Sequence, residues 1–355
     1  MEVRSTPPAA VIGSLNAGTM LARVWCGAAL IALAAASSGA QRPATGYAAG
    51  ARVLLDAHNC YPTDGGYADR IDRALATGLP IAIEQDLFWF TDPRSGGPRS
   101  VVAHTPEEAA TAPGFEEYFF VKVAPIMERA LKENRRESWP LITLNLDFKS
   151  NEPEHHAAVW ALLGKYERWL TTAQRTASPD TLSPLETGPM LVLTGSNDVQ
   201  QSSFHHRVAI GQRLRLFGAT VQPPIPGADR AEQARNIAAM PPATLIPAAT
   251  NYRRWVNFPW AVVEAGGQNV AGEWTAAEAE RLRALVTRAH AVNLWIRFYT
   301  LNGHPKDQGH GWTASYNFGS EQDAKVRWRA AIDAGVDFIA TDQYEAFAQM
   351  KIERR

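Results

Sequence analysis

The feature that most constrains the fold of this chain is a regular alternation of short β-rich runs with helical patterns, from residue 50 to the end. Such an alternation is typical of βα units, whose strands pair in parallel within one sheet. We interpret eight apolar runs as strands: Val53–Ala57, Pro80–Leu87, Leu141–Phe148, Met190–Thr194, Leu214–Ala219, Thr244–Ala248, Val292–Tyr299 and Val336–Thr341.

Helical patterns fall between these runs, and some have recognisable ends. One begins with the capping box Thr275-Ala-Ala-Glu278, and another begins at Ser320 and stops at Gly335. The predicted helices are Tyr67–Thr77, Phe115–Arg136, Glu154–Gln174, Arg230–Met240, Thr275–His290 and Ser320–Ala334. Eight strands with intervening helices predict one (β/α)8 barrel domain over residues 50–355. An open doubly wound sheet would carry a Gly-rich phosphate loop after its first strand.

The first forty residues are typical of a targeting segment. A start at Met20 and the charge of Arg23 precede an apolar run, Val24–Ala36, which is too short to span a bilayer. Small residues at Ser38–Ala40 then form a cleavage site. We therefore expect residues 1–40 to hold a signal peptide that begins at Met20 and is cleaved near Ala40, with export to the periplasm or the medium.

The composition excludes some partners. The 35 Lys and Arg residues balance 36 Asp and Glu residues, and no basic block stands out, so phosphate-backbone binding of a nucleic acid is not expected. Of the two cysteines, Cys26 lies in the predicted signal segment. Cys60 is then alone in the mature chain and has no intramolecular disulfide partner. A hydrophobic fraction of 46% supplies a sizeable core, and we expect a monomer.

Polar side chains gather at the ends of the first three predicted strands: His58, Glu84 with Asp86, and Asp147 with Lys149. Barrel enzymes collect their chemistry at these strand ends. Period two places Glu84 and Asp86 on one face, and the strand spacing of about 4.8 Å brings Asp147 beside them. Three carboxylates repel one another unless a hard divalent cation, Mg²⁺ or Ca²⁺, binds to their oxygens. In the alternative interpretation, Lys149 merely neutralises Asp147 and the other two acids are solvated.

Two histidines flank the predicted metal site. His58 ends strand one, and His104 follows a short β-like run, Ser100–Ala103. Phosphodiester cleavage needs one base and one acid with pKa values near neutral, which a pair of histidines supplies. Lys149 would offset charge on the phosphoryl oxygens.

The ordered set of motifs resembles the phospholipase-C-like phosphodiesterase superfamily. The set comprises His58, Glu84-x-Asp86, Val101-Val-Ala-His104, Asp147-x-Lys149, Leu294-Trp295 and Gly335-Val-Asp-Phe-Ile-Ala-Thr341-Asp342. That superfamily includes glycerophosphodiester phosphodiesterases and sphingomyelinase D-like enzymes. The resemblance implies that Glu84, Asp86 and Asp147 hold one Mg²⁺ or Ca²⁺. It also implies that His58 and His104 are the acid–base pair and that Lys149 steadies the phosphate of a glycerophosphodiester or phospholipid-like substrate.

Two departures from the family pattern bear on the substrate. Glycerophosphodiesterases usually have His-Arg-Gly at strand one, whereas this chain has His58-Asn59-Cys60, so a phosphate-binding Arg is missing. The form Asp147-x-Lys149 is closer to the sphingomyelinase D-like branch. The segment around Asn59, with Tyr61 and Ala74-Leu75-x-x-Gly78, is also similar to the altered-inheritance-of-mitochondria branch.

Three residues are candidates for binding the substrate: Asn59, Trp295 and Arg297. Arg297 and Trp295 share one face of their predicted strand, so Arg297 could replace the missing cation at the mouth of the barrel. In the alternative register, Arg297 faces the helical layer. A lipid substrate would require transient contact with a membrane surface.

Other functions explain fewer of these residues. A glycoside hydrolase uses paired carboxylates, but it needs neither a metal nor two histidines. An amidohydrolase-type site would have His-x-His on strand one, where this chain has only His58. A thiol hydrolase using Cys60 would leave the three acids unexplained. A non-catalytic barrel binding protein would not need the whole set. The residues also leave open whether water or a substrate hydroxyl attacks, the latter releasing a cyclic phosphate in a lyase step.

Overall fold

The computed structural model describes residues 48–63, 66–91, 96–265, 272–305 and 317–352. The predicted signal segment lies outside these residues. Within them, no helix combines the length and the apolar character that a membrane span requires.

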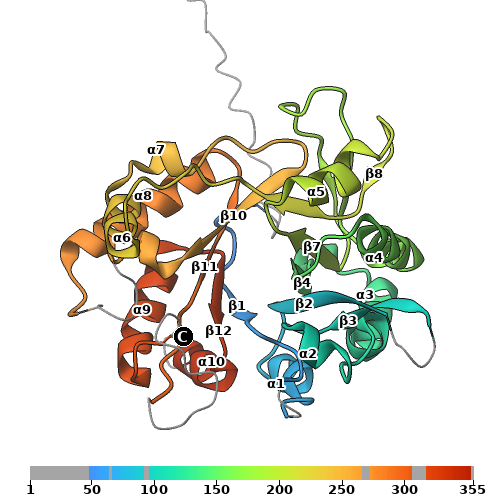
Figure 1. The fold of residues 1–355 in the computed structure, drawn as a ribbon, viewed down its shortest axis with the longest axis horizontal. Coiled ribbons are helices and arrows are strands. Elements are labelled where there is room, and N and C mark those ends of the chain that lie inside the picture. The colour runs from blue at the N-terminus through green and yellow to red at the C-terminus, as the bar shows by residue number, and fades with distance from the viewer. Residues whose placement is uncertain (1–47, 64–65, 92–95, 266–271, 306–316, 353–355) are drawn as a thin grey trace, which may run out of the picture. The chain divides into compact units, whose positions relative to one another are not determined.

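Eight parallel strands close into a barrel, as the ribbon shows (Figure 1). In barrel order they are β1 (Leu54–Ala57), β2 (Ile81–Thr91), β4 (Ile142–Phe148), β7 (Met190–Thr194), β9 (Phe217–Ala219), β10 (Arg253–Pro259), β11 (Trp295–Tyr299) and β12 (Phe338–Thr341). Closure is direct, because β1 pairs in parallel with both β2 and β12. The predicted (β/α)8 barrel is therefore confirmed.

Two further sheet elements extend the barrel. Strand β3 (Pro98–Val102) is antiparallel to the outer half of β2, so the two form a hairpin that continues beyond the barrel wall. A small antiparallel sheet joins β6 (Leu185–Glu186), β5 (Thr172–Gln174) and β8 (Arg213–Leu214).

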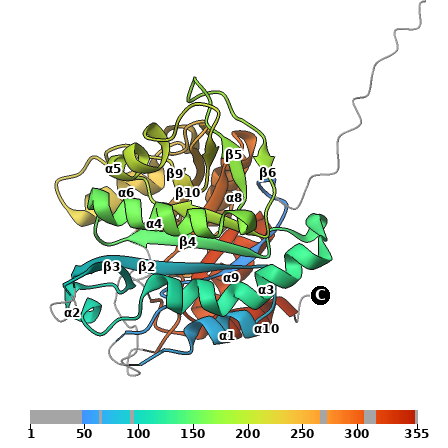
Figure 2. The ribbon, with the colours of Figure 1, turned by 90° about the vertical axis from the view of Figure 1, so that its right-hand side faces the viewer.

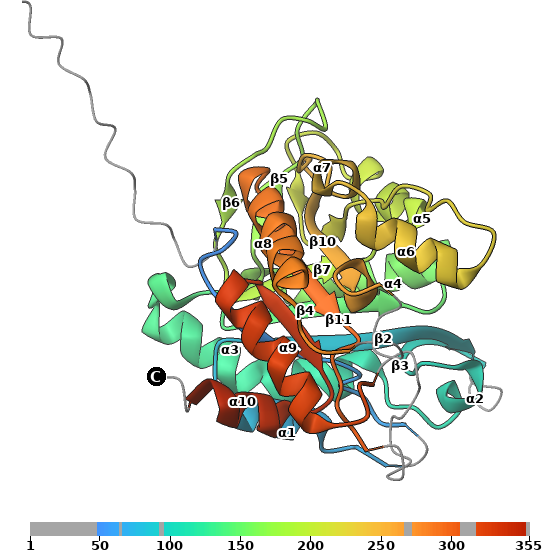
Figure 3. The same ribbon diagram turned by 90° about the vertical axis from the view of Figure 1, so that its left-hand side faces the viewer.

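Helices cover the outside of the barrel. In Figure 2, α3 (Val121–Glu133) and α4 (Pro153–Lys165) run alongside β2 and β4, and in Figure 3, α8 (Ala276–Ala291) and α9 (Glu321–Ala334) run alongside β10 and β11. The remaining helical segments are α1 (Arg70–Ala76), α2 (Pro106–Ala109), η1 (Glu116–Phe120), η2 (Arg136–Ser138), η3 (Glu167–Trp169), α5 (Asp198–Gln201), η4 (Ser202–His206), α6 (Arg230–Ala239), α7 (Pro242–Leu245), η5 (Trp260–Val262) and α10 (Tyr344–Ile352).

The helix ends follow the predicted capping chemistry. Thr275 and Glu278 form the reciprocal capping box at the start of α8. Ser320 caps α9, and Gly335 ends it in the left-handed conformation with φ of 81°. One predicted helix was too long, because Glu154–Gln174 divides into α4, η3 and the strand β5.

The sixth predicted strand was wrong. Thr244–Ala248 overlaps the short helix α7, where Pro242 stands in the first turn and suits a helix start. The true sixth strand is β10, whose inward positions include Trp255 and Asn257 at the barrel mouth. Strand β10 opens with Arg253 and Arg254 and is interrupted by Asn257, so its apolar residues are scattered and its pattern in the sequence is weak. The fifth run also divides, into β8 and β9.

The core has two layers because successive strand residues point to opposite faces. One set fills the barrel interior, and its members include Leu54, Leu191, Phe217, Trp295 and Phe338. The other set, including Leu144, Val192, Val256, Ile296 and Ile339, packs beneath the helices. Trp295 lies near the beginnings of the strands, where it lines a small cavity with Leu54, Leu191 and Phe338.

This position predicts a structural role for Trp295. Replacing it by Ala should lower the free energy of unfolding by about 3 kcal/mol, because the change leaves a cavity in the barrel interior. Trp295→Phe should cost less, and Ile210→Ala, at a side chain that is 63% exposed, should change stability by less than about 0.5 kcal/mol. Denaturant unfolding measures all three. Equal stability of Trp295→Ala and the native protein would contradict this placement.

Candidate active site

A cavity of about 930 Å³ opens at the C-terminal ends of the barrel strands. Seven barrel strands or the residues directly after them contribute lining residues, as expected for the catalytic mouth of such a barrel. The chemically active members are His58, Asn59, Arg70, Glu84, Asp86, His104, Asp147, Lys149, Arg297 and Asp342. All but one of the nine predicted site residues therefore meet here, the exception being Trp295.

The three predicted metal ligands converge. Strands β2 and β4 pair so that Asp86 lies opposite Asp147 and Glu84 lies opposite Asn145. One carboxylate oxygen from each of Glu84, Asp86 and Asp147 lies within 4.8 Å of the other two. Glu84 and Asp86 are buried, whereas the side chain of Asp147 is 47% exposed, which leaves the group open toward the cavity. An all-oxygen, acidic and partly open set fits a hard divalent cation such as Mg²⁺ or Ca²⁺.

The electrostatics of the three acids favour an added positive charge. Burial raises the pKa of Asp86, and the negative charges of Asp147 and Glu84 raise it further, although its hydrogen bond with His104 and the charge of Lys149 oppose the shift. Three ionised carboxylates at this spacing therefore repel one another, and the burial of Glu84 and Asp86 weakens the screening of that repulsion. A bound divalent cation would relieve that repulsion.

Lys149 lies beside two of the acids. Its Nζ donates to Asp147 Oδ2 at 2.7 Å and lies 3.1 Å from Asp86 Oδ2. Burial alone would lower the pKa of Lys149, but Asp86 and Asp147 outweigh burial and raise it, so the side chain is a cation at neutral pH. The lysine thus contacts Asp147, as the simpler interpretation expected, and also lines the cavity.

His58 is held between two carboxylates. Its Nδ1 lies 2.7 Å from Asp342 Oδ1, and its Nε2 lies 3.4 Å from Glu84 Oε2. Burial by itself lowers the pKa of His58, but Glu84 and Asp342 outweigh burial and raise the pKa to about 9. In this arrangement the imidazole is protonated at neutral pH. Cation binding to Glu84 would weaken that effect, because the carboxylate charge would be shared.

His104 reaches the same acids from outside the barrel. It follows β3, and its Nδ1 lies 2.6 Å from Asp86 Oδ2, while the hydroxyl of Tyr61 lies 3.2 Å from the same nitrogen. Glu108 fixes the backbone here, because its Oε2 accepts from the N–H of His104 at 3.0 Å. The side chain is 49% exposed. The two histidines therefore contact different carboxylates of one acidic group.

Asn59 connects residues of the site through hydrogen bonds. It adopts the left-handed conformation, with φ of 50°, which asparagine tolerates better than most residues. Its backbone N–H donates to Glu84 Oε2 at 3.3 Å, and its side-chain amide lies 3.2 Å from both oxygens of Asp342. Tyr61 donates to its side-chain oxygen at 2.9 Å. Asn59 lines the cavity but is already tied to three neighbours.

Arg297 faces the barrel interior, which is the first of the two registers considered for it. Its guanidinium is buried and contacts the carboxylate of Asp56, donates to Asn257 Oδ1 at 3.0 Å, and lies 3.3 Å from Glu84 Oε2. Asp56 and Glu84 therefore balance this cation, which accounts for its charge without a substrate.

Two remaining predictions are placed by the structure. Trp295 does not reach the cavity, since it begins β11 near the opposite end of the barrel, so this location does not support the expected substrate contact. The Cys60 thiol is buried, and burial raises its pKa far above the usual range, which disfavours a thiolate nucleophile.

Sequence reasoning missed several members of the cavity: Tyr61, Arg70, Glu108, Asn257 and Asp342. For Asp342 a signal existed, because an acid directly after a barrel strand falls at the catalytic end. The others come from a loop, from the helices α1 and α2 or from the misplaced strand β10, and their sequence positions do not reveal their partners.

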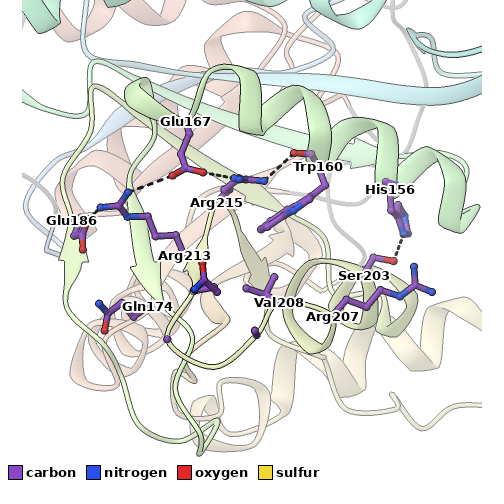
Figure 4. A pocket seen from close by; sticks show the side chains of 14 residues that line it. His156, Trp160, Glu167, Gln174, Glu186, Ser203, Arg207, Val208, Arg213 and Arg215 are labelled. Carbon is purple, nitrogen blue, oxygen red and sulfur yellow. Dashed lines mark hydrogen bonds and ion pairs between the residues drawn. The ribbon is translucent and has the colours of Figure 1, made fainter.

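A second cavity, of about 660 Å³, lies outside the barrel (Figure 4). It shares no lining residue with the first. Arg213 and Arg215 are neutralised there, since both contact Glu167 and Arg213 also contacts Glu186 at 3.0 Å. Among the described residues, the acidic group of the first cavity is the sole cluster of three potential metal ligands. We therefore take the first cavity as the candidate active site.

Fold and site together define a (β/α)8 barrel with an acidic centre suited to a cation and two histidines at its C-terminal mouth. No protein-family model and no curated protein sequence matches the chain. Solved structures resemble it. A glycerophosphoryl diester phosphodiesterase from Parabacteroides distasonis shares 11% identity over 85% of this chain and 87% of its own, with a TM-score of 0.40.

A calcium-dependent phosphoinositol-specific phospholipase C from a Pseudomonas species shares 13% identity over 85% of this chain and 93% of its own, with a TM-score of 0.45. A dihydropteroate synthase from Xanthomonas albilineans also matches. It shares 11% identity over 85% of this chain and 91% of its own, with a TM-score of 0.35. A fold of this kind does not by itself define a function, which depends on the side chains of the cavity.

The acidic group predicts a cation-dependent change in stability. Mg²⁺ or Ca²⁺ at 100 times its Kd should stabilise the protein by about 2.7 kcal/mol. Asp86→Asn should remove that stabilisation, and it should not destabilise the cation-free protein, because burial and like charges already disfavour the ionised Asp86. Thermal unfolding with each cation or with EDTA measures both effects. Asp72→Asn on the exposed face of α1 is the matched control, and an unchanged cation effect in Asp86→Asn would contradict the site.

The contact with Asp342 predicts the titration of His58. Asp342→Asn removes a negative charge 2.7 Å from the ring, so the pKa of His58 should fall from about 9. As the pH rises, the His58 ring of the variant therefore loses its proton at a lower pH than in the native protein. NMR titration of the His58 ring protons in cation-free protein measures this directly. Asp337→Asn, which alters the partner of His290, should leave the His58 titration unmoved, and a rise of the His58 pKa in Asp342→Asn would contradict the assigned contact.

Proposed function

We propose that this protein is a divalent-cation-dependent phosphodiesterase that acts on a glycerophosphodiester or a phospholipid-like substrate. The observation that carries the proposal is that two histidines, from β1 and from the β2–β3 hairpin, contact two different carboxylates of one acidic group. A phosphodiester needs charge neutralisation at its phosphoryl oxygens and a proton donor and acceptor nearby, and this arrangement supplies both.

Glu84, Asp86 and Asp147 would hold the cation, which would supply Lewis-acid polarisation of the phosphoryl group when bound. Lys149 adds a second positive charge beside Asp147. One histidine accepts a proton from the attacking hydroxyl, and the other protonates the leaving alcohol. Asp342 positions the His58 ring, and Asp86 and Tyr61 position the His104 ring. The same residues serve attack by water and attack by a neighbouring substrate hydroxyl, which would release a cyclic phosphate.

The cavity volume of about 930 Å³ suits a small phosphodiester or a lipid headgroup. Two exposed valines, Val199 and Val221, follow the C-terminal ends of β7 and β9 on the side where the cavity opens. They support the proposal of transient contact with a membrane surface when the substrate is a lipid.

Glycoside hydrolysis fits the geometry less well. Oxygens of the three acids lie within 4.8 Å of one another, whereas glycosidase carboxyl pairs are about 5–5.5 Å or 6.5–9.5 Å apart, on either side of the scissile bond. Glu84 and Asp86 also project from a single strand, so they cannot flank a bond from two sides.

The test is turnover of bis-p-nitrophenyl phosphate, glycerophosphocholine and lysophospholipids with Mg²⁺, Ca²⁺ or EDTA. We expect EDTA-sensitive cleavage of at least one substrate. His58→Ala and His104→Ala should each lower kcat by about 10²–10⁴-fold, because each removes an acid–base group. His206→Ala, at an exposed histidine outside the cavity, is the matched control. Failure of all substrates with both cations would refute the proposal, and full activity of Glu84→Ala would refute the site.

A further inference from the structure

Five cationic or protonatable side chains line the catalytic cavity: His58, Arg70, His104, Lys149 and Arg297. Carboxylates of the described residues contact four of these side chains. The exception is Arg70, the first residue of α1, since no Asp or Glu oxygen in the described part of the chain lies within 4.0 Å of its guanidinium. Among the described residues, Arg70 is therefore the cation of this cavity that has no carboxylate in direct contact, although its charge helps to lower the pKa of Asp342.

Arg70 is also deeply placed, with only 8% of its surface exposed. Its Nη1 donates to the backbone oxygen of Asn59, and its guanidinium lies over the ring of Tyr67, 4.3 Å from the ring centre. A carbonyl and an aromatic face hold the group in place but carry no full negative charge. A buried guanidinium that no described carboxylate contacts directly gains from an anion that binds beside it in the cavity.

The contacts place Arg70 next to the reactive group. Asn59 accepts from Arg70 and donates its own N–H to Glu84 Oε2 at 3.3 Å, so one residue separates the guanidinium from a proposed metal ligand. Lys149 contacts the acidic group from β4 by way of Asp147 and Asp86. A phosphoryl group at the proposed metal centre would thus have one cation from the start of α1 and another from the end of β4.

We propose that Arg70 binds a phosphoryl oxygen of the substrate and so supplies the arginine that is missing beside His58. Asn59 stands directly after His58, where that arginine would be. The backbone oxygen of Asn59 accepts a hydrogen bond from Arg70, and Arg70 reaches the cavity from the start of α1. Arg297 does not serve this role, because Asp56 and Glu84 already balance its charge. This inference rests on the proposed phosphodiesterase function.

The test compares Arg70→Gln, Arg70→Lys and native protein for Kd of inorganic phosphate by calorimetry with Mg²⁺ present, and for KM with a hydrolysed diester. Arg70→Gln should raise both by about 10- to 100-fold, the loss expected for one charge-assisted hydrogen bond. Arg70→Lys keeps the charge and should give a smaller rise. Arg73→Gln, three residues further along α1 and paired with Glu345 at the surface, should change neither.

A purely structural role of Arg70 gives a different result. Arg70→Gln would then unfold at lower temperature yet bind phosphate as tightly as native protein, and that outcome overturns the proposal. If Arg70→Gln does not fold, chemical modification of the native protein tests the proposal instead. Phosphate should slow the modification of Arg70 by phenylglyoxal and should not slow that of Arg73. Equal modification of Arg70 with and without phosphate overturns the proposal. Phosphate binding that depends on Arg70 in a protein without diester turnover would contradict the proposed function alone.

Discussion

The candidate site depends on the repulsion among three carboxylates whose oxygens lie within 4.8 Å of one another at the barrel mouth, two of them buried. Each acid has basic neighbours: Arg297 and His58 beside Glu84, Lys149 and the His104 ring beside Asp86, and Lys149 beside Asp147. Without these partners, burial of the acids would be prohibitively costly. The arrangement therefore explains why polar residues from so many strands converge, and why a divalent cation would fit among them.

Much of the barrel could be predicted from the sequence, because seven strands are mostly buried and overlap the apolar runs that predicted them. The eighth, β10, was misplaced because it carries Arg253 and Asn257 among its apolar residues, and no short-range pattern distinguishes such a strand from a loop. Strand ends identified the three acids and both histidines, since consecutive βα units bring neighbouring ends together. For these five residues, the position in the sequence pattern was enough to predict the position in the fold.

The partners of those residues could not be predicted in the same way. Asp342 reaches His58 from 284 positions away, and Asp56 reaches Arg297 from 241 positions away, so only closure of the barrel reveals either pair. Trp295 shows that the face of a strand residue can be predicted while its depth in the barrel cannot. Period two correctly places it on the same face as Arg297, but a side chain two residues earlier lies deeper in the barrel, near the other end. Facing inward and reaching the mouth are separate properties.

Strand β2 serves two purposes along its length. Its first half, through Leu87, pairs with β4 and carries both Glu84 and Asp86, and from Leu87 onward it pairs with β3, which leads to His104. Leu87 thus lies opposite Phe148 on one side and Val102 on the other. This register ties His104 to the acids whatever the length of the connection between Thr91 and Pro98. Evolution could therefore lengthen, shorten or recompose that connection to suit new substrates while the reactive groups stayed in place.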